Sequence, residues 1–189
     1  IVDEGDFYIT TDSNPNSPYE YTSKDWLIDT EYLNEQEKFL NIYFRLPYDV
    51  EIVAKECGEA NMYYDWEVKK IILCYEFIDL TYNDFITYYN NNPELGITEE
   101  DVEVMVLSVI DFAFYHEVGH AVIDIYNLPI TGLEENVSDQ FATLFLLLTE
   151  DADENNILGQ NMLYDVGTWF FIQTELNYEE VYWDTHNFD

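Results

Sequence analysis

Basic residues are scarce in this chain, and their scarcity limits its partners. Lys and Arg together number 6 against 40 Asp and Glu, which gives a formal net charge of −34 over 189 residues. Because so negative a protein repels the phosphates of nucleic acids and the anionic surfaces of membranes, we expect neither as a partner. We interpret the acidity as a solvated surface. Adaptation to high salt, attraction of basic substrates or cation binding would each produce the same excess of acidic residues.

Long apolar runs, linkers and repeats are also missing. No stretch reaches the roughly 18 apolar residues that a membrane span needs, so we expect no membrane insertion. The N-terminal Ile1-Val2-Asp3-Glu4 lacks the basic and apolar regions of a signal peptide, so we expect any export signal to have been removed. No repeat or low-complexity linker divides the chain. Its amino-acid composition, 48% hydrophobic and 17% aromatic, suits one packed core. We therefore predict a single domain over residues 1–189.

Cysteine is nearly absent, since Cys57 and Cys74 are the only two. Two β-rich runs lie between them, separated by Asp65-Trp66-Glu67, so we predict a disulfide across a hairpin. Two buried free thiols are the alternative. The cysteine count suits an exported protein, secreted or periplasmic.

Hydrophobic periodicity predicts a mixture of strands and helices. Strands are expected at residues 7–10, 50–54, 61–65 and 70–77. Helices are expected at residues 30–44, 79–89, 98–126, 134–148 and 153–176. The longest helix is expected to begin at Thr98 as its N-cap, with acidic residues in its first turn, and to be mostly buried.

This long helix carries the most informative motif of the chain, His116-Glu117-Val118-Gly119-His120. Histidines four residues apart project from one face of a helix and can bind a single Zn²⁺ ion, while the glutamate lies beside the open side of the metal. The pattern is typical of a zinc metalloprotease. The alternative is two histidines that only satisfy hydrogen bonds on an ordinary helix.

A catalytic zinc site usually takes three protein ligands and leaves a fourth position for water, so a third ligand is needed. The next predicted helix begins with Glu134 and Glu135 and continues to Asp139. Glu135 and Asp139 lie four residues apart on one face. From the residues alone, any of these three carboxylates could be the ligand, or all three could simply favour the helix N-terminus.

Two resemblances narrow these alternatives. Glu135-x-x-Ser138-Asp139 resembles the second-helix signature of thermolysin-like gluzincins, which implies Glu135 as the third zinc ligand and Asp139 as the partner that orients His116. The chain also resembles the DUF4344 metallopeptidase family, mostly exported bacterial proteins. This second resemblance rests on blocks at residues 57–61, 64–65, 73–76, 114–124, 128–135 and 139–143.

The family resemblance implies an α+β, zincin-like fold. We expect a single domain with a small, mostly antiparallel sheet, a long active-site helix and further C-terminal helices. It also implies peptidase activity on a peptide or protein substrate.

In such a reaction Zn²⁺ activates a water molecule and Glu117 acts as the general base. The oxyanion needs a further donor. His186 is the only other histidine in the chain and one candidate, and the phenols of Tyr164, Tyr178 and Tyr182 are others.

Substrate would pair with an edge strand, at residues 61–65 or 70–77, unless these residues form only a buried structural hairpin.

A non-catalytic acidic binding or scaffold protein with a structural zinc site is the rival interpretation. The intact Glu117 argues against it, because a structural site needs no general base and is usually closed by a fourth protein ligand. A calcium-binding protein is a further rival, but no stretch matches the EF-hand loop, so this rival rests on charge alone.

Overall fold

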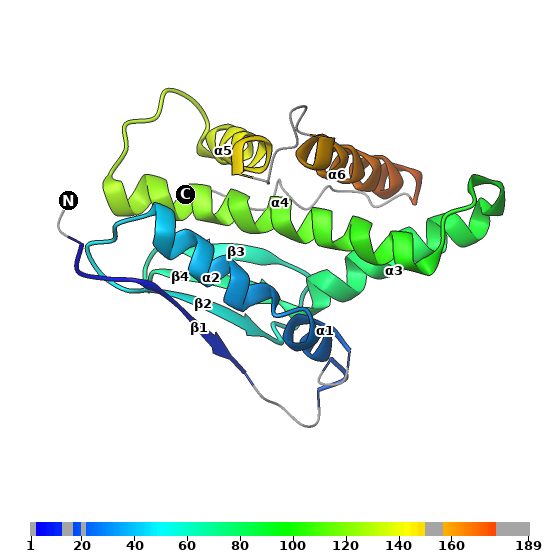
Figure 1. Ribbon diagram of the computed structural model, residues 1–189, viewed down its shortest axis with the longest axis horizontal. Coiled ribbons are helices and arrows are strands. Elements are labelled where there is room, and N and C mark those ends of the chain that lie inside the picture. Colours follow the sequence, from blue (N-terminus) through cyan, green and yellow to red (C-terminus); the bar gives the residue numbers. More distant parts are fainter. Residues whose placement is uncertain (1–2, 13–16, 20–21, 150–156, 177–189) are drawn as a thin grey trace.

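The computed structural model describes residues 3–12, 17–19, 22–149 and 157–176 (Figure 1). Its α-helices are α1 (Ser23–Asp29), α2 (Tyr32–Tyr43), α3 (Tyr75–Asn91), α4 (Glu99–Tyr126), α5 (Glu134–Thr149) and α6 (Ile157–Glu175). Its strands are β1 (Phe7–Thr11), β2 (Val50–Lys55), β3 (Met62–Asp65) and β4 (Lys70–Cys74), and a 3-10 turn covers Pro93–Leu95. The expected α+β class is confirmed.

The four strands form one sheet in the order β1-β2-β4-β3. β1 pairs with β2 and β2 with β4 in parallel, and only β3 pairs with β4 antiparallel. The expected mostly antiparallel sheet is therefore wrong. The physical reason is that α1 and α2 carry the chain back between β1 and β2, which makes that pair parallel. β3 lies at the edge, and the hairpin returns β4 beside β2.

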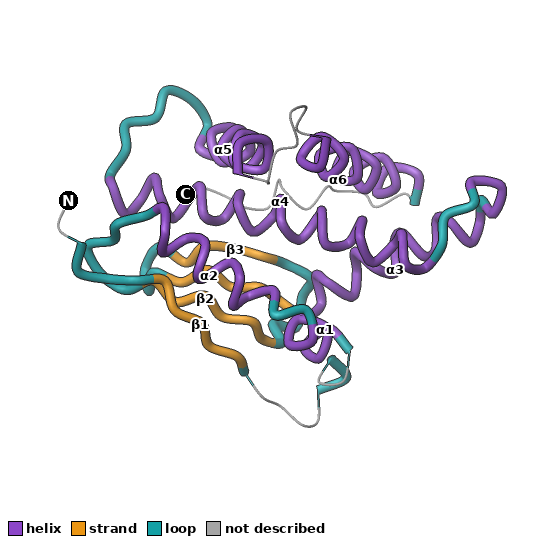
Figure 2. The backbone as a smooth tube through the Cα atoms, in the orientation of Figure 1, coloured by secondary structure: helices purple, strands orange, loops and turns teal. Residues whose placement is uncertain are grey.

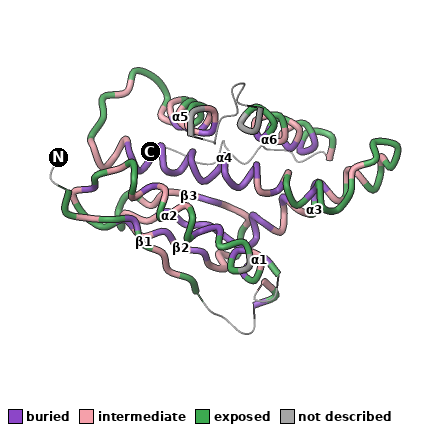
Figure 3. The backbone as a smooth tube through the Cα atoms, in the orientation of Figure 1, coloured by how far each residue is buried: buried purple, intermediate pink, exposed green. Residues whose placement is uncertain are grey.

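The long helix α4 lies between two layers, with the sheet on one side and α5 and α6 on the other (Figure 2). Every residue from Ser108 to Val122 is buried (Figure 3). A helix that is apolar all round belongs in a core. By length and composition α4 could cross a membrane, but 89% of its most apolar 18-residue window is buried inside the molecule. The predicted buried helix is confirmed.

Polar contacts fix the N-terminus of α4 and hold α2 against the middle of this helix. Thr98 and Asp101 form a reciprocal capping box at its N-terminus, so the expected N-cap is confirmed. Further along, Gln36 of α2 donates from Nε2 to Asp111 Oδ1 over 3.0 Å and accepts at Oε1 from the Tyr115 hydroxyl over 2.6 Å. These bonds hold α2 beside the middle of α4, just before the histidines.

Two element boundaries differ from the sequence prediction. The strand expected to reach residue 77 ends at Cys74, and α3 begins at Tyr75 rather than at residue 79. Residues 71–78 are all buried, and a continuous apolar run does not distinguish a strand from a helix. The short helix α1 was not predicted at all. The expected start of the last helix at residue 153 lies outside the described residues.

The predicted disulfide between Cys57 and Cys74 is present, with Cα atoms 5.4 Å apart. Cys57 lies in the connection before β3 rather than in the hairpin, so the bond ties this connection to the end of β4. Glu76 supports the same turn, because its carboxylate accepts the backbone N–H groups of Cys57 and Gly58. A disulfide is consistent with an oxidising, extracytoplasmic location.

Candidate functional site

The two motif histidines face each other on α4. His116 and His120 are one turn apart, and their Nε2 atoms lie 3.0 Å from each other. Both side chains are buried in the middle of the molecule. The helix spacing alone puts the two rings on one face, as the sequence predicted.

The following helix, α5, brings a carboxylate to the same place. Its Glu135 lies with Oε2 3.1 Å from His116 Nε2 and Oε1 3.5 Å from His120 Nε2. One potential ligand atom from each of these three residues lies within 4.8 Å of the others. The chain reverses between α4 and α5 through a connection that begins at Asn127, whose φ of 48° ends α4 in the left-handed conformation.

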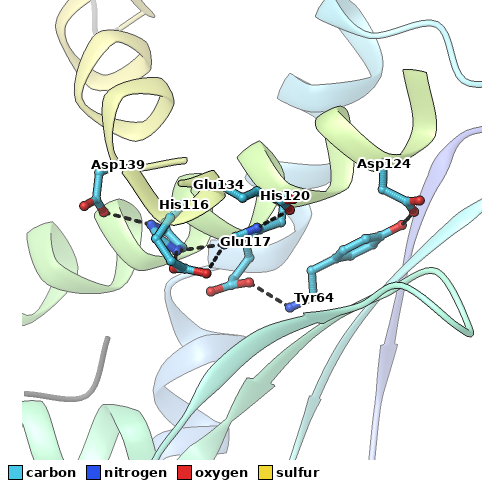
Figure 4. Close-up of polar contacts among 8 residues, drawn as sticks. Tyr64, His116, Glu117, His120, Asp124, Glu134 and Asp139 are labelled. Carbon is cyan, nitrogen blue, oxygen red and sulfur yellow. Dashed lines mark hydrogen bonds and ion pairs between the residues drawn. The ribbon is translucent and has the colours of Figure 1, made fainter. Parts of the chain in front are cut away.

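The other two candidate carboxylates contact the opposite side of the rings (Figure 4). Asp139 Oδ1 lies 2.9 Å from His116 Nδ1, and Glu134 Oε1 lies 2.8 Å from His120 Nδ1. Each histidine therefore has a carboxylate partner of its own behind it. The structure places Asp139 beside His116, where the sequence resemblance expected it. It also gives Glu134, which the sequence offered only as a possible ligand, an equivalent position beside His120.

These partners decide where the imidazole protons lie. A carboxylate accepts a hydrogen bond, so neutral His116 and His120 carry their protons on Nδ1 and direct the lone pairs of Nε2 toward each other and toward Glu135. Among the described residues, Glu135 Oε1 has no hydrogen-bond partner although it is buried there. Three electron-pair donors converging without a proton between them repel one another unless a cation binds. The residues present therefore fit a divalent metal ion.

The protonation of the same groups supports this fit. Burial by itself would lower the pKa of His116, but hydrogen bonds to Asp139 and Glu135 outweigh burial and raise it to about 9. Burial would raise the pKa of Glu135, but its interactions with the two histidines hold that pKa well below its usual range. Without a metal the centre thus attracts a proton, which is the positive charge that a metal ion would replace.

A glycine inside the motif allows α5 to come this close. A Cβ atom at Gly119 would lie 3.1 Å from the Cα atom of Ser138 and 3.3 Å from its Cβ atom. Ser138 is fully buried, one residue before Asp139. A larger side chain at position 119 would push apart the helices that carry the two halves of the centre.

The motif glutamate points to the sheet rather than to α5. Glu117 is 1% exposed, and its Oε2 accepts the backbone N–H of Tyr64, on β3, over 2.7 Å. It lines a cleft of about 690 Å³ between β3 and the C-terminal half of α4. The residues around this cleft are Glu59, Asn61, Tyr63, Tyr64, Trp66, Glu117, His120, Ile123, Asp124, Asn127, Leu128, Ile130, Glu134 and Glu135.

Sequence reasoning gave no role to Tyr64 or Asp124, which meet at the cleft wall. Asp124 follows Glu117 by seven residues and therefore lies on the same helix face, a signal that the sequence does contain. No local sequence pattern predicts the role of Tyr64, because its contact with Glu117 joins residues 53 positions apart.

The predicted oxyanion donors gain no support from the geometry. His186, Tyr178 and Tyr182 lie outside the described residues, so their roles stay predictions. Tyr164 is 76% exposed on α6 and is not one of the residues that line the cleft.

Comparison with known proteins agrees with this geometry. Comparisons with curated proteins and with solved structures give no significant match. The model of the DUF4344 family, described as "Putative metallopeptidase", matches residues 13–189. This match includes both helices of the candidate metal centre, the strand that contacts Glu117 and the disulfide. By its sequence from end to end of that range, the chain belongs to the DUF4344 family.

Proposed function

We propose that this protein is a zinc-dependent peptidase in which Glu117 is the general base. One observation carries the proposal. A buried carboxylate, Glu117, lies beside a cluster of two imidazoles and one carboxylate, and both open onto the same cleft. The family match supports peptide hydrolysis in general, and the metal and the mechanism are our inference.

Zinc suits the donor set best. Two histidines and one glutamate with a remaining open position are the ligands of catalytic zinc in metallopeptidases. His116, His120 and Glu135 would hold the ion. Bound there, zinc would lower the pKa of a water molecule toward neutrality and polarise the carbonyl of a peptide bond.

Glu117 would transfer the proton during the reaction. Its carboxylate accepts one proton from the attacking water and passes it to the amide nitrogen as the C–N bond breaks. The water oxygen ends in the new carboxylate product. The N–H of Tyr64 donates to Glu117 Oε2 and fixes the orientation of the carboxylate.

β3 is the better of the two strands that the sequence offered for substrate binding. β4 has strands on both sides, whereas β3 lies at the sheet edge that borders the cleft. The bond from Cys74 N–H to the Asn61 carbonyl sets the alternation along β3, so that the peptide groups of Met62 and Tyr64 face away from β4. The carbonyl groups of Met62 and Tyr64 would accept hydrogen bonds from an extended substrate, since the N–H of Met62 is donated to Asn61 Oδ1 and that of Tyr64 to Glu117.

The rival interpretation, a structural zinc site in a binding protein, predicts a fourth protein ligand. Within the described part of the chain, the cluster around the two histidines has His116, His120 and Glu135 as its members. His120 and Glu135 also line the cleft, which favours an open position for water.

The test combines metal content with peptide cleavage. Purified protein should contain about one zinc per chain and cleave members of a peptide library, and Glu117→Gln should abolish cleavage while zinc stays bound. Glu103→Gln is the matched control, because it removes the same charge from an exposed position on α4 about 21 Å along the helix from Glu117. Cleavage that survives in Glu117→Gln rejects the general base. Zinc without cleavage in the wild type favours the binding protein.

A further inference from the structure

Two side chains beside the candidate metal centre converge on one carboxylate oxygen of a third residue. Asp124 Oδ2, near the end of α4, accepts the Tyr64 hydroxyl over 2.7 Å and lies 2.6 Å from Lys69 Nζ. Tyr64 belongs to β3, and Lys69 to the turn between β3 and β4. We call Tyr64, Lys69 and Asp124 the clamp, since it joins the edge of the sheet to the active-site helix.

The clamp includes a lysine at a backbone position that favours glycine. Lys69 has φ of 56°, in the left-handed region. A residue with a Cβ atom costs roughly 1–2 kcal/mol there, whereas glycine is free of this strain. Lys69 is also one of only 6 basic residues in the chain. Strain of this kind persists where a side chain has a specific task, and the ion pair to Asp124 provides one.

Tyr64 connects the clamp to the chemistry. Its backbone N–H holds Glu117 Oε2, and its phenol holds Asp124 two helical turns further along α4 (Figure 4). Burial, together with the hydrogen bond to Asp124, raises the pKa of Tyr64 far above its ordinary value, so the phenol remains a donor. One residue of β3 thus contacts α4 at two points.

The position of β3 depends on such contacts, because within the described part of the chain β3 has a strand neighbour on one side only. Its opposite edge faces the cleft and α4. A movement of the β3–β4 turn away from Asp124 would withdraw the N–H of Tyr64 from Glu117. The side chains of Lys69 and Asp124 are each 31% exposed, so their ion pair is partly shielded from water.

We propose that the clamp holds β3 against α4 and thereby fixes the carboxylate of Glu117 for proton transfer, which makes Asp124 and Lys69 positioning residues. The inference rests on the proposed peptidase function. A displaced general base lowers the rate of the chemical step, and small misplacements can cost as much as 100-fold. We expect kcat to fall about 10-fold when the clamp is broken, with zinc content unchanged.

Lys69→Gly is the decisive variant. It removes the ammonium group but relieves the left-handed strain, so the protein should remain as stable as the wild type or become more stable. A merely structural lysine would then leave kcat unchanged, whereas a positioning lysine lowers it. Lys69→Gln should lower kcat similarly, and Lys69→Arg should restore it because the cation is retained. Lys70→Gln is the matched control, since Lys70 forms its 2.6 Å ion pair with Glu51, away from α4.

A second readout needs no catalysis. Hydrogen exchange of the Tyr64 amide, followed by NMR, should accelerate about 10-fold in Lys69→Gly and in Tyr64→Phe, because the bond to Glu117 opens more often. The Cys74 amide, which bonds to Asn61 within the sheet, should remain protected and serves as the internal control.

The two readouts separate this inference from the proposed function. If the wild type cleaves no peptide, the peptidase proposal fails, and faster Tyr64 exchange in the variants would still support the clamp. If the wild type cleaves peptides and Lys69→Gly keeps both normal kcat and normal Tyr64 exchange, the clamp is wrong.

Discussion

At the scale of single residues, the candidate centre depends on which nitrogen of each histidine faces a carboxylate. Asp139 and Glu134 contact the Nδ1 atoms, whereas Glu135 contacts the Nε2 atoms. Carboxylates behind a ligating histidine orient the ring and raise its basicity, but they do not bind the metal themselves. The three acidic residues should therefore differ in how much zinc affinity they contribute.

Substituting these carboxylates one at a time tests the difference. We expect Glu134→Gln and Asp139→Asn each to weaken zinc binding by about 10- to 100-fold, the usual effect of losing a partner behind a ligand. Glu135→Gln should weaken binding by more than either. Competition against a chromophoric chelator measures all three affinities. A larger loss in Glu134→Gln than in Glu135→Gln would exchange the roles of the two residues.

The raised pKa of His116 predicts a pH dependence for the metal-free protein. Because folding raises this pKa from 6.5 to about 9, protonated His116 stabilises the fold, fully below about pH 6.5, and this stabilisation is lost as pH rises through 9. The loss should be about 3 kcal/mol. Urea unfolding in the presence of a chelator, repeated across this pH range, measures it.

The zinc-loaded protein should show the opposite trend. Metal binding requires deprotonated Nε2 atoms, so zinc stabilises the fold more as pH rises through the same interval. Comparing the two forms at each pH removes contributions from the other titrating groups. Metal-free protein that becomes more stable between about pH 6.5 and 9 would contradict the protonated centre.

At the scale of elements, the connection before β3 is held by a covalent bond as well as by Glu76. The Cys57–Cys74 disulfide closes a loop with a sequence separation of 17. In the chain-entropy model, closing a loop of this length stabilises the folded state by about 3 kcal/mol. This loop contains β3 and the β3–β4 turn, and so the strand that contacts Glu117.

Removing the disulfide should therefore destabilise the protein. We expect the double variant Cys57→Ser/Cys74→Ser to lose about 3 kcal/mol of unfolding free energy, measured by urea denaturation. Treating the wild type with a thiol reductant should reproduce the loss, and the same reductant should leave the double variant unaffected. Equal stability of the oxidised and reduced wild type would mean that Glu76 holds the connection without the bond.

The elements also show how far the sequence predicts this structure. The extent of α4, its cap at Thr98 and the facing histidines follow from local spacing, and the sequence predicted all three. Strand order does not follow from local patterns, because β2 and β4 are joined only through long-range pairing, and the prediction of a mostly antiparallel sheet was wrong. The contact of Tyr64 with Glu117 likewise could not be predicted from the sequence, since it depends on β3 being an edge strand.

At the scale of the whole molecule, negative charge is far in excess. Among the basic residues, Lys38, Arg45, Lys69 and Lys70 each form an ion pair with a carboxylate. These pairs still leave a formal net charge of −34. Such self-repulsion destabilises a compact state, and salt screens it over a Debye length that shrinks from about 10 Å at 0.1 M to about 3 Å at 1 M.

We therefore expect sodium chloride to stabilise the zinc-saturated protein. The midpoint of thermal unfolding should rise by several degrees between about 0.1 M and 1 M salt, since about 1 kcal/mol shifts the midpoint of a domain this size by about 2–4 °C. Sucrose of equal osmolality controls for effects unrelated to charge. A midpoint that falls with salt would indicate that the ion pairs contribute more than the repulsion costs.

The candidate metal centre lies between two helices rather than within one loop. His116 and His120 come from the most deeply buried part of α4, and Glu135 reaches them only where Gly119 lets α5 approach. A newly synthesised chain therefore has no complete metal-binding site until α4 and α5 have packed together. The zinc content of a preparation should then report the fraction of correctly folded molecules. A chelator should destabilise the fold as well as inhibit the activity.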